Sequence, residues 1–237
     1  MSREVSEKLS EEHQSLVVYG LLLKLREQEK NIVKQMSELE ERKEFYSEEE
    51  YRELMDKLSQ QIENVKSDIE RAKKVKKNLK IELLLEELDE YLTALNEVRK
   101  LFDTGVISER AFNLINDACK SKIDTVSSEI NSEKSIYERL LTVLKSRREL
   151  IQSELALLEA RASLDMIVNP KKSDETFNRA QLLRKQLLET DLIILAVEDL
   201  LKRASEVRPS TKPTERKVAP PPPPKEKRET KLGGFEF

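Results

Sequence analysis

Residues 123–158 read IDTVSSEINSEKSIYERLLTVLKSRRELIQSELALL, and their apolar side chains recur at alternating spacings of three and four residues. Such a heptad pattern keeps one stripe facing a neighbouring helix and favours a left-handed coiled coil. Lys134 and Arg148 interrupt the stripe, whose apolar members are Ile123, Val126, Ile130, Tyr137, Leu141, Leu144, Ile151, Leu155 and Leu158. A second stripe predicts packing on two sides; it consists of Ile136, Leu140, Val143, Leu150 and Leu157.

The sequence on either side of this stretch is nearly free of helix-breaking residues. No Gly or Pro lies between Gly20 and Gly105, and the first Pro is Pro170. These stretches consist mostly of Leu, Glu, Lys, Arg and Ser, which are compatible with an α-helix. We therefore expect an all-α fold, an elongated antiparallel coiled coil or bundle of about four long helices joined by short loops. The expected helices are Ser10–Arg42, Glu48–Lys100, Glu109–Asp165 and Asp174–Ala204.

Three Ser residues mark the expected helix starts after the loops. Ser47, Ser108 and Ser173 are each followed by acidic residues and by an aromatic residue one turn later. A Ser hydroxyl can accept a hydrogen bond from a free amide of the first turn, and acids are favoured at the positive end of a helix. We therefore place a helix N-terminus at each of these positions.

The first two starts also open an internal repeat, near residues 45–70 and 102–130. At an offset of 61 residues, Tyr51, Leu54, Leu58, Ile62, Val65 and Ile69 match Phe112, Ile115, Cys119, Ile123, Val126 and Ile130. This match predicts a duplicated helical hairpin within a helical region that spans residues 1–205.

Folding the chain at its three loops predicts where the core lies. The apolar run Leu16–Leu23 then falls level with residues 72–79, 137–140 and 199–201, and the apolar run Leu192–Val197 falls close to that level. We expect a local four-helix core there and a thinner two-helix coiled coil beyond it. Each buried large apolar side chain contributes about 1.5–3 kcal/mol, so a dozen of them can hold such a core.

Composition narrows the possible functions. Charged residues make up 38% of the chain and aromatic residues 5%, which is typical of coiled coils. The net charge of −3 gives no overall attraction to nucleic acid. A single cysteine, a polar N-terminal segment and no apolar run of about 20 residues predict a soluble cytoplasmic protein.

The residues that could carry catalysis do not form a recognisable site in the sequence. His13 and Cys119 are the only residues of their kind, so they cannot complete a metal tetrahedron. Cys119 falls on an apolar position of the repeat, which favours core packing over a nucleophile. The acids 48–50 fit the first turn of a helix, and Gly233-Gly234 precedes no helix. We expect no enzyme, no catalytic residue, no metal and no cofactor.

A basic cluster between residues 71 and 80 has three interpretations. It contains no acid, and its bases are Arg71, Lys73, Lys74, Lys76, Lys77 and Lys80. The first interpretation is a solvated helix face. The second is contact with an anionic surface, with membrane ahead of nucleic acid because no aromatic residues are interleaved for base stacking. The third is self-assembly, since the acidic block 81–90 follows directly and could set the stagger between copies.

The C-terminal part predicts a disordered arm that ends in a short motif. Residues 206–230 form a Pro-rich linker that contains five consecutive prolines, 220–224. Residues 231–237 then restore apolar character through Leu232, Phe235 and Phe237. The two Phe rings would point the same way in an extended strand, which fits strand addition to the sheet of a partner protein. The alternative is an exposed chain end without a function.

The turn formed by Leu101, Phe102, Gly105, Ile107, Ser108 and Phe112, together with its long flanking helices and terminal peptide, resembles a known family. It looks like the coiled-coil part of the archaeal cell-division protein A (Cdv-type) family over residues 40–165 and the tail. That family usually opens with a small β-barrel, whereas this chain begins in helix. The resemblance implies filament formation alongside ESCRT-III division proteins. It also implies docking of Leu232, Phe235 and Phe237 on an ESCRT-III winged-helix domain.

Taken together, these patterns predict a non-enzymatic scaffold that forms homo-oligomers and recruits a protein partner through its C-terminal peptide. The resemblance places it in archaeal-type cell division or ESCRT-III-linked membrane remodelling, in the cytoplasm, at the division site or the membrane periphery. Two alternatives stay open. One is an ESCRT-III-like subunit, because helical hairpins with a proline linker and a terminal motif also resemble those proteins. The other is a peripheral protein that binds membrane, or less plausibly DNA, through the basic cluster.

Overall fold

The structure is a computed structural model that describes the backbone of residues 3–168 and 170–206 and the side chains of residues 3–162 and 175–206. This part of the chain is all-α, as expected, and contains no strand. Its elements are α1 (Arg3–Glu41), the 3-10 helix η1 (Lys43–Phe45), α2 (Glu48–Val75), α3 (Lys80–Asp103), α4 (Glu109–Val168) and α5 (Pro170–Glu206).

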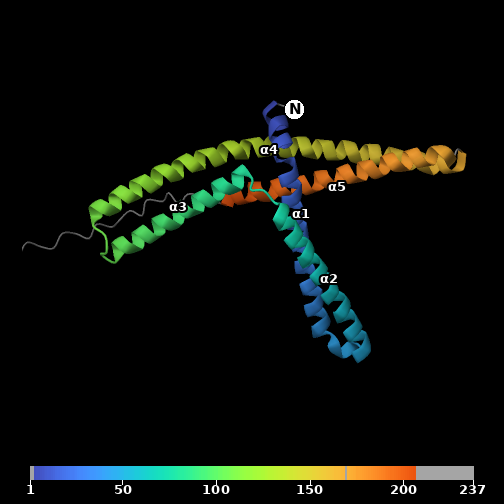
Figure 1. The fold of residues 1–237 in the computed structure, drawn as a ribbon, viewed down its shortest axis with the longest axis horizontal. Coiled ribbons are helices and arrows are strands. Elements are labelled where there is room, and N and C mark those ends of the chain that lie inside the picture. Colours follow the sequence, from blue (N-terminus) through green and yellow to red (C-terminus); the bar gives the residue numbers. More distant parts are fainter. Residues whose placement is uncertain (1–2, 169, 207–237) are drawn as a thin grey trace, which may run out of the picture.

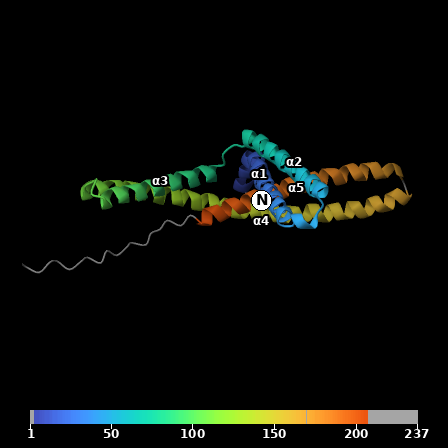
Figure 2. The same cartoon turned by 90° about the horizontal axis from the view of Figure 1, so that it is seen from below.

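Helix α4 is the spine of the molecule. Its 60 residues correspond to a length of roughly 90 Å. Helix α3 packs along the first half of α4 and α5 along the second half, so that these three helices form one elongated layer (Figure 1). Helices α1 and α2 form a hairpin that crosses this layer near its middle (Figures 1 and 2). Three two-helix arms therefore leave a common centre.

The predicted four-helix core is confirmed at the centre, where α1, α3, α4 and α5 meet. The largest of its fully buried side chains come from all four helices: Leu16, Leu79, Ile81, Leu88, Tyr137, Leu140, Leu144, Val197 and Leu200. The run Leu192–Val197 contributes to the same cluster. Counting outward from the loops thus gave the correct level of the core along the chain.

The single helix predicted over Glu48–Lys100 is wrong, because residues 76–79 interrupt it. Lys76 (φ −64°, ψ 131°) and Leu79 (φ −84°, ψ 148°) are extended, and we call residues 76–79 the elbow. The apolar pattern explains the break. At about 100° per residue, Ile81 would lie roughly 180° around a continuous helix from Ala72, so the two halves would face opposite sides. The elbow instead turns α3 onto α4 and leaves α2 on α1.

This break also changes the predicted shape. We expected one two-helix coiled coil that runs away from the core, and the structure has three arms that point in different directions (Figure 1). Because α2 and α3 are not collinear, the α1–α2 hairpin leaves the layer instead of extending it. Only α1 of this hairpin packs closely on the layer, where it contacts α5 and α4, whereas α2 packs on α1 (Figure 2).

Two of the three predicted helix starts are confirmed by their hydrogen bonds. The Ser47 hydroxyl accepts from the Glu50 amide, and the Glu50 carboxylate accepts from the Ser47 amide, which is a complete capping box. The Ser108 hydroxyl accepts from the Ala111 amide at 3.3 Å. The third start was placed too late, since α5 begins at Pro170. Pro suits a first helical position because the amide it lacks would be unpaired there.

The positions matched in the predicted repeat have similar exposure in the α1–α2 and α3–α4 arms. Near the tips, Leu54 and Ile115 are 37% and 40% exposed, whereas near the centre both Ile69 and Ile130 are buried. The main stripe of α4 faces its partners along its whole length, and none of its apolar members is exposed. The second stripe is covered only near the centre. Leu140 is buried there, whereas Leu150 and Leu157 are 71% and 72% exposed on the α4–α5 arm.

Candidate functional site

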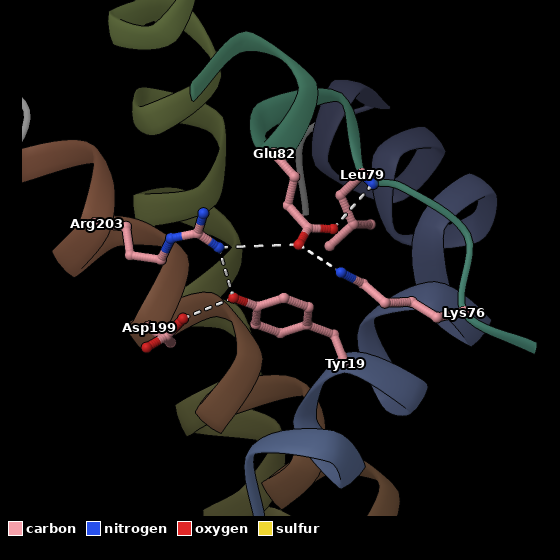
Figure 3. Close-up of polar contacts among 6 residues, drawn as sticks. All are labelled: Tyr19, Lys76, Leu79, Glu82, Asp199 and Arg203. Carbon is pink, nitrogen blue, oxygen red and sulfur yellow. Dashed lines mark hydrogen bonds and ion pairs between the residues drawn. The ribbon is translucent and has the colours of Figure 1, made fainter. Parts of the chain in front are cut away.

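The centre of the molecule holds a partly buried polar cluster that joins α1, the elbow, α3 and α5 (Figure 3). Glu82, 4% exposed, is its middle member. Its carboxylate lies 2.7 Å from the Lys76 ammonium and 3.8 Å from the Arg203 guanidinium, and it accepts the Leu79 amide at 3.2 Å. We call Tyr19, Lys76, Glu82, Asp199 and Arg203 the latch.

Tyr19 connects α1 to the latch. Its hydroxyl donates to Asp199 at 2.7 Å and accepts from Arg203 at 2.9 Å, and the Lys76 ammonium lies 4.9 Å from the centre of its ring. Burial and the hydrogen bond to Asp199 raise the pKa of Tyr19 to about 12. The phenol therefore stays protonated and keeps donating at neutral pH. With two cations and two carboxylates, the latch is balanced in charge.

Local sequence explains why the latch forms at the start of α3. Leu79 cannot accept a hydrogen bond as a cap, but its side chain is 1% exposed and anchors the elbow in the core. Glu82, at the third position of α3, reaches back to the Leu79 amide and satisfies a donor that the helix leaves free. The same carboxylate then attracts Lys76 from the other side of the elbow. The bend thus depends on burial of Leu79 and on Glu82.

A second buried polar cluster lies beside the latch, between α1 and α4. The Tyr137 ring is fully buried, and its hydroxyl donates to Glu12 at 2.5 Å. Glu133, 5% exposed, pairs with Lys8 at 2.8 Å and with Lys80 at 2.7 Å. We call these five residues the α1–α4 cluster. It fixes the N-terminal half of α1 on the layer.

The pKa values of the α1–α4 cluster follow from burial and pairing. Burial alone would raise the pKa of Glu133, but hydrogen bonds from Lys8 and Lys80 outweigh it and lower the value. Burial would lower the pKa of Lys8, and its bonds to Glu133 and Glu12 raise it instead. The pKa of Tyr137 is raised, first by burial and then by its bond to Glu12. Glu133, Lys8 and Tyr137 thereby keep their ordinary ionisation states at neutral pH.

The structure gives the six bases of the predicted basic cluster different environments. Four of them lie in ion pairs with acids of the same chain: Arg71 with Asp68, Lys73 with Glu70, Lys76 with Glu82, and Lys80 with Glu133. Lys74 and Lys77 are exposed and have no ion pair among the residues that the structure describes. The cluster surrounds the elbow, and two of its members belong to the buried polar clusters.

The other sequence predictions meet the structure to different extents. Leu232, Phe235 and Phe237, predicted to bind a partner, lie outside the described residues, as does the linker 207–230. Cys119 is partly buried on the α3–α4 arm, in line with its place in the repeat. Within the described ranges there is no grouping of three or more His, Cys, Asp or Glu side chains fit for a metal ion. Likewise, none of the described helices has the length and apolar character that a membrane span requires.

The latch and the α1–α4 cluster are not among the sites predicted from the sequence. Two signals in the sequence could have indicated the latch. Tyr19 is the one polar-tipped residue in the apolar run Leu16–Leu23, and Glu82 is the one acid in the run Ile81–Leu85. A polar group within an apolar run is worth attention because it must find a partner when the run is buried. The partners themselves, Asp199 and Arg203, carry no such signal.

No protein-family model, no curated protein and no solved structure matches this chain. At the centre, charged groups and hydroxyls from different helices and the elbow are paired with one another. Chemically, this arrangement can hold α1 and the elbow in place.

Proposed function

We propose that this chain is a non-enzymatic helical scaffold that self-associates through its helices and recruits a protein partner through residues 231–237. The observation that carries the proposal is the division of the fold into three two-helix arms around one small core. The arms point away from one another and expose long helical surfaces, on which other copies of the chain can pack. The setting we propose, from the sequence resemblance, is archaeal-type cell division or ESCRT-III-linked membrane remodelling.

Exposed apolar side chains on the arms support the self-association. The α4–α5 arm exposes Leu150 and Leu157 on α4. It also exposes Phe177 and Leu182 on α5, whose exposed fractions are 53% and 56%. The α1–α2 tip adds Phe45, which is 83% exposed. Single exposed apolar residues are common, but a series of them along one arm is typical of an interaction surface.

The position of the last described residue supports the recruitment step. Helix α5 ends at Glu206 beside α3, close to the centre of the molecule and far from the arm tips (Figure 1). The segment that carries Leu232, Phe235 and Phe237 is therefore attached at the centre. A partner bound there would leave all three arms available for contacts with other copies.

Recruitment is tested by removing residues 232–237. Full-length and shortened chains are titrated calorimetrically against a purified archaeal ESCRT-III winged-helix domain. We expect the full-length chain to bind, and at least tenfold weaker binding after the deletion, because the apolar anchors are lost. A chain with Phe235 and Phe237 changed to Ala should behave like the shortened chain, and Lys231→Ala like the full-length chain. Equal binding by the full-length and shortened chains, or no binding by either, would contradict the recruitment proposal.

Self-association is tested by sedimentation of the full-length chain over a range of concentrations. A scaffold of this kind should show species larger than one chain that increase with concentration. A single monomeric species at all concentrations would contradict this part of the proposal.

A further inference from the structure

Within the described chain, the elbow is the only covalent connection between the α1–α2 hairpin and the layer. Residues 3–75 form the hairpin and residues 80–206 form the layer, so the four residues 76–79 are their covalent link. The hairpin also has an apolar seam of its own. Leu22, Leu25, Ile69 and Ala72 form a cluster that is separate from the main core. A hairpin lifted off the layer would keep this seam intact.

The contact between the hairpin and the layer combines apolar side chains of α1, such as Val5 and Leu16, with specific polar pairs. The latch, the α1–α4 cluster and an ion pair of 2.8 Å between Glu4 and Arg139 all cross it. Gly20 adds a close approach of two backbones, because a methyl group at its Cα would lie 1.9 Å from the carbonyl oxygen of Leu192. Every group in this contact is present in every copy of the chain. A second copy can therefore supply the same surface.

The elbow is held bent against the preference of its own sequence. Residues 76–79 read KKNL, with no Gly or Pro, and three of the four residues are good helix formers. Extending the helix through them would give one helix from residue 48 to residue 103, roughly 84 Å long. What opposes it is the burial of Leu79 and the contacts of Glu82.

Straightening the elbow would place the apolar face of α2, around Ala72, and the apolar face of α3, around Leu88, on opposite sides of one helix. Leu88 would lie about 160° around the helix axis from Ala72. Helix α1, which packs on the face of Ala72, would then be separated from α4 and α5, which lie on the face of Leu88. In a straightened chain the hairpin thus cannot return to its own layer, and the contact surface of α1 is left for another copy.

We propose that the chain dimerises by exchange of the α1–α2 hairpin, with the elbow straightened and the latch formed between α1 of one copy and α5 of the other. Exchange of an identical element is a low-cost route to dimers, because the interface already exists within one chain. This inference specifies the self-association of the proposed function and depends on it. It identifies the partner as a second copy and the docking surface as the face of α5 around Leu192 and Asp199.

The first experiment compares Lys77→Pro with Lys77→Ala in the full-length chain. Lys77 is exposed, its amide makes no hydrogen bond among the described residues, and Lys76 already has the backbone conformation preferred before proline. Lys77→Pro therefore removes no hydrogen bond from the bent elbow and agrees with the conformation of Lys76, but it forbids a continuous helix. Both variants remove the same charge. Each is refolded at high concentration, and the dimer fraction is measured by light scattering after size exclusion.

We expect Lys77→Pro to weaken dimerisation by about a hundredfold or more, as a proline within a helix does to the helical state. Lys77→Ala should dimerise as well as the natural chain or better. Equal dimer fractions in the two variants would overturn the exchange.

The second experiment detects the exchanged contact directly. In a Cys119→Ser background, one chain carries Glu4→Cys and another carries Arg139→Cys; these two residues face each other across the contact and are both about half exposed. The chains are unfolded, mixed, refolded together and treated with a short bis-maleimide. A cross-link between the two chains is expected only if α1 of one copy lies on the layer of the other. A chain with both cysteines is the positive control for the contact.

The outcomes separate this inference from the proposed function. A dimer without the cross-link between chains would overturn the exchange and leave self-association through the arms. A monomer under all conditions would overturn both the exchange and the self-association. A dimer with the cross-link, reduced by Lys77→Pro, supports the exchange. Recruitment through residues 231–237 is measured independently of all three.

Discussion

Gly20 allows α1 to cross α5 at very short distance. It lies inside α1, where a Gly costs about 1 kcal/mol relative to Ala, so its presence indicates a compensating contact. That contact is the Leu192 carbonyl, 1.9 Å from where a Cβ would stand. Since the obstacle is backbone, it cannot move aside as a side chain would. The absence of a single methyl group thus sets the position of the hairpin on the layer.

We predict that Gly20→Ala destabilises the protein by about 1–3 kcal/mol, the usual cost of overpacking, even though Ala is the better helix former. The measurement is the free energy of unfolding in urea. Ser37→Ala, an exposed site on the same helix, is the control and should be neutral or slightly stabilising. If Gly20→Ala were stabilising to the same extent as the control, α1 would not cross α5 as closely as described.

The α1–α4 cluster makes stability depend on pH in a predictable direction. The pKa of Glu133 is lowered in the folded state, so its contribution is present above the unfolded value near 4.5 and is lost as the pH falls through the folded value. The pKa of Lys8 is raised, so its contribution is present below 10.5 and is lost at higher pH. The raised pKa of Tyr137 acts at the alkaline end in the same direction.

We therefore expect the free energy of unfolding to be level near neutral pH with respect to this cluster and to decline in acid and in alkali. Glu133→Gln should lower stability at pH 7, because it leaves Lys8 without one of its carboxylates in a buried site. It should also flatten the decline below pH 5. Urea titrations at several pH values measure both effects. An unchanged acid limb in the variant would show that Glu133 does not carry this dependence.

At the scale of elements, the sequence predicted the helix caps but not the elbow, because the elbow has neither a capping Ser nor a helix-breaking residue. Ser47 and Ser108 were found because a cap is a local interaction between near neighbours in the chain. The elbow carries no Gly, Pro or Ser. Glu82 does bond locally to the Leu79 amide, but the bend also depends on tertiary contacts, which are the burial of Leu79 in the core and the pairing of Glu82 with Arg203. The one sequence signal was the change in apolar register between Ala72 and Ile81, which a helix of constant phase cannot accommodate.

The pairings within the polar clusters could not be predicted from the sequence for the same reason. Tyr19 and Asp199 are 180 residues apart in the chain, and Tyr137 and Glu12 are 125 apart. Predicting such pairs requires the direction in which each arm leaves the core as well as its level. The level of each residue along the bundle could be counted from the loops. This count correctly predicts core residues such as Leu16, Tyr137 and Leu200. The direction depends on the elbow, which was not predicted.

The Ser47 cap offers a prediction at this scale. Replacement of Ser47 by Ala removes the acceptor for the Glu50 amide and should cost the first turn of α2 about 1 kcal/mol. Because the cap lies at the tip of an arm, we expect the loss to appear as faster amide hydrogen exchange in residues 48–51 and not at the centre. Glu50→Gln keeps part of the capping box and is the milder comparison. Uniform acceleration across α1 and α2 would mean that the arm opens only as a unit.

At the scale of the whole molecule, composition and heptad spacing predicted extended helices and left their arrangement open. Each stripe requires a partner, but any partner of suitable register satisfies it. The choice among partners is made at the centre, where buried carboxylates such as Glu82 and Glu133 require the cations with which they pair. The arms, which carry exposed apolar residues such as Leu150, can then contact other molecules while the contacts of the core stay within the chain.

The charge available on the surface around the elbow decides what it can bind. Four of the six bases between residues 71 and 80 are paired with acids of the same chain. Lys74 and Lys77 thus provide most of the attraction to an anionic surface, about 1 kcal/mol each near a charged membrane. We therefore predict that the protein sediments with vesicles rich in phosphatidylserine at low salt and is released at physiological salt.

Replacing Lys74 and Lys77 together by Glu should abolish the binding at low salt. The matched control replaces Lys24 and Lys30, two exposed bases of α1, by Glu and so makes the same change in net charge. If both double variants lost binding equally, the attraction would come from net charge and not from the elbow. If vesicle binding persisted at physiological salt in the natural chain, the ion pairs of the other four bases would have to open at the membrane, and the buried Glu82 and Glu133 would then lose their partners.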